Sequence, residues 1–88
     1  MAWTLEVSRE AQKDFKKLDP KVADRITIKL LQIASLENPR LKGHALAGRY
    51  AGFWRYRVSD YRVIARIEDG RMVIVVVALG HRREVYRD

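Results

Sequence analysis

The stretch FWRYRVSDYRVIARI, residues 53–67, alternates mostly between apolar and cationic side chains with a period of two residues. This period is typical of β-strands, whose successive side chains point to opposite faces of a sheet. Ser59-Asp60 interrupts the alternation and predicts a two-residue turn between two antiparallel strands. The face of this hairpin that we expect to enter the core carries Trp54, Tyr56, Val58, Tyr61, Val63 and Ala65.

The same turn predicts that like charges lie opposite each other. A two-residue turn at Ser59-Asp60 pairs Arg57 with Arg62 and places Arg55 opposite Ile64. Directly opposed like charges destabilise a sheet. This face therefore predicts either acidic neighbours that neutralise the arginines or a bound anion, and a solvated sheet face is the alternative. Its cationic residues are Arg55, Arg57, Arg62 and Arg66.

A second hairpin is predicted by Asp69-Gly70, which leads into an apolar strand at residues 72–79. Because that strand is apolar on both faces, we expect it to have neighbours on both edges. Continuing the register through the turn places Arg62 opposite Val77 and Ile64 opposite Val75. The arginine-bearing face then gains an apolar floor. It suits either a stacked, phosphate-bearing ligand or an amphipathic segment of an acidic protein. The floor consists of Ile64, Val73, Val75 and Val77.

The residues before this region predict two helices. Ser8 and Asp19 are each suited to cap a helix N-terminus, and Pro20 suits a first helical position. The second helix is expected to end before Asn38-Pro39. Apolar residues recur at helical spacing after each cap and should face the sheet: Ala11, Phe15 and Leu18 in the first helix, and Val22, Ile26, Leu30 and Ile33 in the second.

Two segments complete the predicted fold. Residues 3–7 alternate and predict a short strand beside residues 72–79. Residues 37–49 show little periodicity and predict a loop that contains His44 and is anchored by Leu41 and Leu46. The prediction is an α+β domain spanning residues 1–88. An N-terminal strand and a helical hairpin precede a three-stranded antiparallel meander, giving a four-stranded sheet with the helices on one face.

Charge and composition restrict the function classes. Eighteen Lys and Arg residues against eleven Asp and Glu give a net charge of +7 and a pI of about 10.1, which favours an anionic partner, either nucleic acid or an acidic protein. The absence of cysteine excludes disulfides and thiolate metal sites. The longest uncharged apolar run, residues 72–80, is too short to cross a bilayer, and no secretory leader is recognisable. We therefore expect a cytoplasmic protein without membrane contact, metal or cofactor.

The C-terminal stretch concentrates ionisable groups after the predicted central strand. His81, Arg82, Arg83, Glu84 and Tyr86 follow one another closely there, where sites are commonly built. A basic site without a metal could act on RNA. A base would remove the proton of a 2′-hydroxyl, arginines would stabilise the charge that gathers on the phosphoryl oxygens, and an acid would protonate the leaving 5′-oxygen.

Four segments in this order, residues 46–48, 52–58, 60–64 and 80–87, resemble the RelE branch of the RelE/ParE toxin superfamily. The resemblance implies a toxin of a type II toxin–antitoxin system. Such a toxin enters the A site of the 70S ribosome and cleaves the mRNA there without a metal. An acidic antitoxin wraps and neutralises it, and the pair contacts promoter DNA only through the antitoxin.

The resemblance also implies roles for single residues. Arg55 and Arg57 stand where the family has two basic residues lining the cleavage site. Arg62 matches the arginine that holds the phosphate, and Arg82 matches the one assigned to the leaving group or transition state. Tyr86 matches the C-terminal tyrosine that stacks on the nucleotide or helps to deprotonate it.

One departure from the family concerns the general base. Relatives often carry lysines where this chain has Arg55 and Arg57, and a guanidinium does not lose its proton in proteins. The base would then be Tyr86, His81 or Glu84. We group His81 and Arg83 with the substrate-binding residues.

Two other functions remain open at this point. A ParE-like toxin of the same fold would poison DNA gyrase without acting as a nuclease. The third possibility is an inactive module that only binds an antitoxin. The complete set of basic residues and Tyr86 favours the nuclease.

Overall fold

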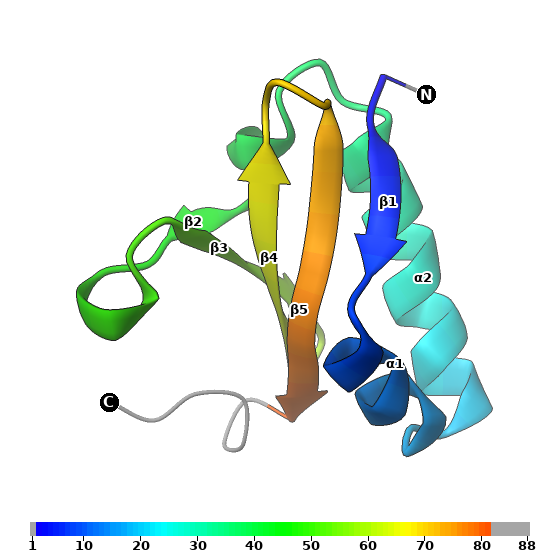
Figure 1. Cartoon of the computed structure of the whole chain (residues 1–88). Coiled ribbons are helices and arrows are strands. Elements are labelled where there is room, and N and C mark those ends of the chain that lie inside the picture. The colour runs from blue at the N-terminus through cyan, green and yellow to red at the C-terminus, as the bar shows by residue number, and fades with distance from the viewer. Residues whose placement is uncertain (1, 82–88) are drawn as a thin grey trace.

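A computed structural model describes residues 2–81 of the chain. Its strands form one sheet in the order β1-β5-β4-β3-β2 (Figure 1). None of the helices in this part of the chain combines the length and apolar character needed to span a bilayer. In chain order the elements are β1 (Thr4–Val7), α1 (Arg9–Lys16), α2 (Pro20–Ala34), the 3-10 turn η1 (Pro39–Lys42), β2 (His44–Ala45), the 3-10 turn η2 (Gly48–Tyr50), β3 (Phe53–Val58), β4 (Tyr61–Glu68) and β5 (Val73–His81).

The predicted four-stranded sheet is wrong, because the sheet has five strands and mixed direction. The extra strand is β2, where His44 pairs with Arg55 and Ala45 with Trp54 in a segment expected to be a loop. A strand of two residues is too short to show an alternation in the sequence. The N-terminal strand β1 does lie beside β5 as predicted, and it runs parallel to β5 while the other pairs are antiparallel.

Both helices begin at the predicted caps. The Ser8 hydroxyl accepts a hydrogen bond from the Ala11 amide at 3.1 Å, and the Asp19 carboxylate accepts one from the Lys21 amide at 2.9 Å. These bonds satisfy amide groups that a helix start otherwise leaves without partners. Helix α2 ends at Ala34, before Asn38-Pro39 as predicted.

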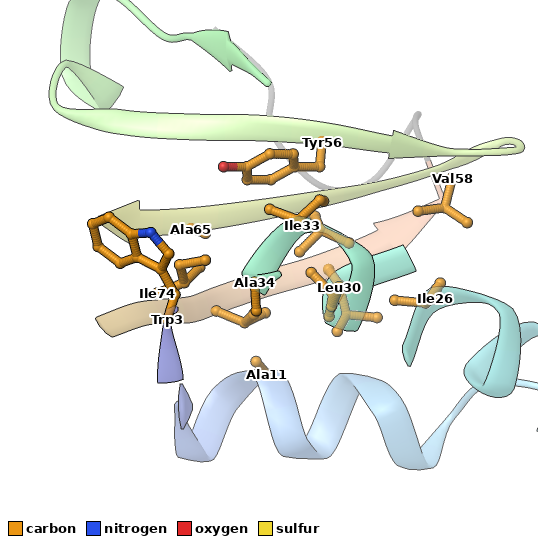
Figure 2. Close-up of a cluster of buried hydrophobic side chains, with 13 residues drawn as sticks. Trp3, Ala11, Ile26, Leu30, Ile33, Ala34, Tyr56, Val58, Ala65 and Ile74 are labelled. Carbon is orange, nitrogen blue, oxygen red and sulfur yellow. The ribbon is translucent and has the colours of Figure 1, made fainter. Parts of the chain in front are cut away.

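The core lies between the helices and one face of the sheet (Figure 2). Ile26, Leu30 and Ile33 of α2 are buried there, which confirms the predicted face of this helix. The expected anchor Leu41 is wrong, since it is 74% exposed, and the buried residue of η1 is Pro39. The predicted core face of the hairpin is confirmed: Tyr56, Val58, Val63 and Ala65 are buried in the cluster, with Trp54 and Tyr61 packed against it.

Tyr56 joins the sheet to the segment after α2. Its ring is fully buried, and its hydroxyl donates a hydrogen bond to the Pro39 carbonyl at 2.9 Å. Gly43 lies so close to this ring that an added Cβ would stand 2.9 Å from a ring carbon. The absence of a side chain at Gly43 therefore allows the turn to pack on Tyr56.

The buried Tyr56 predicts a loss of stability in alkali. Burial raises the pKa of Tyr56 to about 12, an effect that the charge of Arg40 opposes, whereas an unfolded tyrosine titrates near pH 10. Because the folded pKa is the higher one, the stabilisation is complete below about pH 10 and is lost as the pH rises through about 12. The loss should approach about 2–3 kcal/mol.

Denaturant unfolding of the parent and of Tyr56→Phe at pH 8 and at pH 12 measures this loss. The variant should be less stable at pH 8 by about 1 kcal/mol, because the Pro39 carbonyl loses its donor. It should then lose less stability than the parent on going to pH 12. Equal losses in the two proteins would contradict the assignment.

Candidate functional site

The sheet face that turns away from the helices carries a group of arginines on β3 and β4. Arg57 pairs with Arg62, and Arg55 pairs with Ile64, which confirms the predicted register of this hairpin. Tyr56 lies between Arg55 and Arg57 in β3, and Val63 follows Arg62 in β4; both side chains enter the core. Because side chains alternate along a strand, the arginines lie on the opposite face. We call Arg55, Arg57 and Arg62 the arginine face.

The three arginines differ in exposure. Arg57 is exposed, whereas Arg55 and Arg62 are half-buried and their Nε atoms are closed off from solvent. The sheet therefore holds the side chains of Arg55 and Arg62 close to its surface, while Arg57 extends into water. A face with this arrangement can hold an anion, because guanidinium groups bind phosphate oxygens with two parallel hydrogen bonds.

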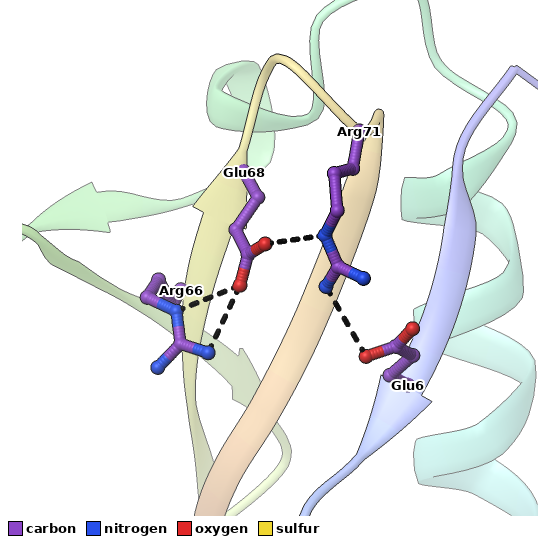
Figure 3. Close-up of polar contacts among 4 residues, drawn as sticks. All are labelled: Glu6, Arg66, Glu68 and Arg71. Atoms are coloured by element: carbon purple, nitrogen blue, oxygen red, sulfur yellow. Dashed lines mark hydrogen bonds and ion pairs between the residues drawn. The ribbon is translucent and has the colours of Figure 1, made fainter.

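Arg66 lies on the same face of β4 but belongs to a different group of charges (Figure 3). Its Nε and Nη2 donate to one oxygen of Glu68 at 3.0 and 2.9 Å. Arg71 donates to the other oxygen of Glu68 at 2.7 Å and reaches Glu6 of β1 at 3.5 Å. Hydrogen bonds from Arg71 and Arg66 lower the pKa of Glu68, so this carboxylate stays charged and balances them.

The sequence predicted either acidic neighbours for these arginines or a bound anion, and the two alternatives apply to different parts of the sheet. Acidic neighbours balance Arg66 and Arg71 over β4, β5 and β1. The three guanidinium groups of the arginine face lie together on β3 and β4. The exposed ion pairs contribute little to folding stability. Their main effect is to make the region around Arg66 and Arg71 less attractive to anions.

The predicted register between β4 and β5 is wrong. Arg62 pairs with Gly80 rather than Val77, and Ile64 pairs with Ala78 rather than Val75. Part of the difference comes from the turn, because Glu68 pairs with Val73 and the turn spans residues 69–72. The rest comes from a β-bulge that places one extra residue, Val77, in β5.

The apolar floor expected beneath the arginines is present, with a different layout. Ile64, Val73 and Val75 are buried on this side of the sheet although no helix of the described chain covers them, and Val77 is half-buried. A hollow of about 210 Å³ lies over part of this floor, between the strands and η2. Its lining consists of Arg49, Tyr50, Phe53, Ile64, Val77 and Ala78.

Sequence reasoning missed three residues near this site. Arg49 and Tyr50 line the hollow, and His44 stands directly opposite Arg55 in the register of β2 and β3. They lie in or near the short segments that show little periodicity. The available signal was the pair Gly48 and Gly52, which adopt left-handed backbone angles, with φ of 65° and 94°, at the two ends of this turn.

His81 lies on the other side of the sheet from the arginine face. It pairs with Tyr61, and the two rings meet edge to face with centroids 5.7 Å apart. A hollow of about 350 Å³ lies between these residues and the end of α1, and its lining includes Asp14 and Lys17. The structure therefore brings Arg55, Arg57 and Arg62 together but places His81 apart from them. Arg82, Arg83, Glu84 and Tyr86 lie outside the described residues.

Comparison with known proteins adds a family. Residues 5–86 match the model of the ParE toxin of type II toxin–antitoxin systems. The chain is 31% identical to the mRNA interferase toxin RelE of Escherichia coli K12, with 100% of this chain and 94% of that protein covered. It is 29% identical to Toxin RelG of Mycobacterium tuberculosis, with 99% of each covered.

Solved structures agree with these relatives. A chain of the toxin–antitoxin complex RelBE2 from Mycobacterium tuberculosis superposes with a TM-score of 0.84 at 27% identity, covering 93% of this chain and all of the other. A variant of Escherichia coli toxin RelE in complex with an antitoxin RelBc peptide gives a TM-score of 0.75 at 28% identity, covering 92% of this chain and 84% of that one.

Proposed function

The chain belongs to the ParE toxin family of type II toxin–antitoxin systems, within the RelE/ParE superfamily, and we propose that it is an endoribonuclease that cleaves mRNA in the ribosomal A site. The observation that carries the proposal is the arginine face, where Arg57 and Arg62 stand directly opposite each other beside Arg55. Guanidinium groups this close together suit an anion that several of them can hold at once, and the phosphate of RNA is such an anion. The name of the Escherichia coli relative supports mRNA as the substrate.

The proposed reaction is attack by a ribose 2′-hydroxyl on the adjacent phosphate. A base takes the 2′-hydroxyl proton, the new bond forms between that oxygen and phosphorus, and the bond from phosphorus to the 5′-oxygen breaks. An acid protonates the leaving oxygen, so the products carry a 2′,3′-cyclic phosphate and a 5′-hydroxyl. Arg62 binds the phosphoryl oxygens, and Arg55 and Arg57 hold the neighbouring backbone.

Residues beyond the described part of the chain complete this proposal. The family resemblance assigns Arg82 to the leaving group or transition state and Tyr86 to the nucleotide, and we group Arg83 with the substrate-binding residues. Arg55 and Arg57 cannot accept the proton, so Tyr86 is the proposed base. Glu84 and His81 are the alternatives, and the position of His81 on the helix side of the sheet makes it the weaker of the two.

We also propose an acidic antitoxin as partner, with promoter DNA contacted only through that antitoxin. The net charge of +7 and the arginine face support an acidic partner. The Mycobacterium tuberculosis and Escherichia coli neighbours described above are toxins in complexes with antitoxins. The antitoxin would cover the arginine face and so block access of RNA.

Salt should weaken the binding of this antitoxin. Charge attraction mainly accelerates encounter, and salt screens it. Stopped-flow measurements over a range of NaCl concentrations should show an association rate that falls with salt and a dissociation rate that changes less. An association rate that does not depend on salt would contradict the charge-based interface.

The second candidate function is poisoning of DNA gyrase, which the match to the ParE model favours. Expression of the chain in cells and in a cell-free translation system separates the two. Cuts within codons, mapped as new mRNA 5′ ends, support the nuclease. Induction of the SOS response with intact mRNA supports the gyrase poison, and neither effect would indicate an inactive antitoxin-binding module.

A further inference from the structure

The hollow beside the arginine face has the lining of a site for a flat aromatic ligand. Ile64, Val77 and Ala78 of β4 and β5 are apolar members of the lining, and Tyr50 and Phe53 are its two aromatic residues. Arg49 adds a cation to the lining. The volume of about 210 Å³ is large enough for one small ring system.

A β-bulge in β5 shapes one wall of this hollow. Ala65 pairs with Val76 and Ile64 with Ala78, so Val77 is the extra residue. As a result, the consecutive residues Val77 and Ala78 both line the hollow, although successive residues of a regular strand would point to opposite faces. Bulges re-aim side chains in this way and are frequent beside active sites.

Two glycines shape the opposite wall. Gly48 has a φ of 65° and Gly52 a φ of 94°, which are angles that glycine adopts readily and other residues rarely do. An added Cβ at either position would meet nothing within 4 Å, so backbone conformation and not space explains the glycines. Between them, η2 carries Arg49 and Tyr50 into the lining of the hollow. Figure 1 shows this turn extending beyond the β2–β3 end of the sheet.

The hollow also has a defined position relative to the arginine face. Ile64 of its floor is the register partner of Arg55. Arg62 lies two residues from Ile64 on the same face of β4, a separation of about 7 Å along a strand. The distance between the phosphate and the base of one nucleotide is similar.

We propose that this hollow, lined by Tyr50, Phe53 and Ile64, holds a nucleobase of the RNA next to the phosphate bound by the arginine face. The inference rests on the function proposed for that face. Every nucleobase can stack on an aromatic side chain, so this stacking does not depend on the RNA sequence. The planar guanidinium group of an arginine can add to the stacking. An apolar side chain of an acidic protein partner would fill the same volume, but the negative charge for Arg49 and the adjacent Arg55 would have to come from other residues of that partner. A nucleotide offers both the ring and the negative charge.

Titration of the antitoxin-free chain with adenosine 3′-monophosphate, followed by nuclear magnetic resonance, tests the inference. The resonances of Ile64, Val77 and Ala78 should shift, and the nucleotide should bind more tightly than inorganic phosphate. Tyr50→Leu keeps an apolar side chain without an aromatic ring and should weaken nucleotide binding about ten- to a hundredfold. Binding of inorganic phosphate should be unchanged in that variant.

Two further variants are controls. Tyr50→Phe retains the ring and should bind the nucleotide like the parent. Ile28→Ala removes an exposed apolar side chain of α2 and should also have no effect. Equal binding of nucleotide and phosphate, or full binding by Tyr50→Leu, would overturn the inference. Shifts at the hollow that only an antitoxin peptide produces would overturn it in favour of a protein anchor.

The outcome is separable from that of the proposed nuclease. The titration needs no cleavage and no ribosome. Ring-dependent nucleotide binding by a chain that leaves mRNA intact would support the base site and reject the nuclease. Cleavage of mRNA by a chain without ring-dependent binding would overturn the base site alone.

Discussion

Arg62→Ala should slow cleavage of ribosome-bound mRNA by about 10²–10³-fold, the loss typical when one donor to a developing oxyanion is removed. Arg62 stands directly opposite Arg57, and its Nε is enclosed at the sheet surface. The guanidinium is therefore held in position before substrate arrives. The fold should persist in the variant, because the substitution removes one partner of a like-charge pair.

Single-turnover cleavage on programmed ribosomes measures this effect, with thermal unfolding to verify the fold. Arg66→Ala is the matched control, since Arg66 lies on the same strand and face but is paired with Glu68. The control should cut at nearly the parental rate. Parental activity in Arg62→Ala, or equal losses in both variants, would refute the role assigned to Arg62.

Tyr86→Phe should reduce the single-turnover rate by about 10²–10⁴-fold if Tyr86 is the general base. The assignment follows from the family resemblance and from the inability of Arg55 and Arg57 to accept a proton. A phenolate among arginines is stabilised by their charge, which is the condition for a tyrosine to act as a base. Phenylalanine keeps the ring and removes the group that exchanges the proton.

Comparison with Tyr86→Ala separates proton transfer from stacking. If Tyr86 is the base, both variants should be slow. A Tyr86→Phe variant that cuts at the parental rate, beside a slow Tyr86→Ala, would show that the ring only stacks. The base would then be sought with Glu84→Gln and His81→Gln.

Local patterns in the sequence were sufficient to predict much of the fold. The alternation in residues 53–67 and the Ser59-Asp60 turn predicted the pairing of Arg57 with Arg62, and Ser8 and Asp19 predicted both helix starts. The residues that determine these features lie within one turn or one strand pair. Such features are set by local geometry, so the chain itself displays them.

The features that were missed depend on contacts that leave little periodic signal. Strand β2 has only two residues, and it forms a strand because β3 offers a free edge. The register of β4 with β5 depends on a turn of residues 69–72 and on the bulge at Val77. Neither feature changes the apolar character of β5, so the sequence pattern remained compatible with the shifted register.

The candidate site was predictable to the same extent. The arginine face follows from the β3–β4 register, which the alternation and the Ser59-Asp60 turn predict. The division of charge was not, because Arg66 finds Glu68 within its own strand while Arg71 reaches across to Glu6 on β1. The hollow of Tyr50 and Phe53 was missed because the bulge and the η2 turn create it together.

The most direct test of the proposed function uses ribosomes programmed with an mRNA that carries a 2′-deoxynucleotide at the A-site position otherwise cut. We predict that the chain cleaves the all-ribose mRNA within the A-site codon, leaving a 2′,3′-cyclic phosphate and a 5′-hydroxyl, and leaves the substituted mRNA intact. Cleavage of the substituted mRNA would contradict attack by the 2′-hydroxyl, and an all-ribose mRNA that stays whole would contradict the nuclease itself.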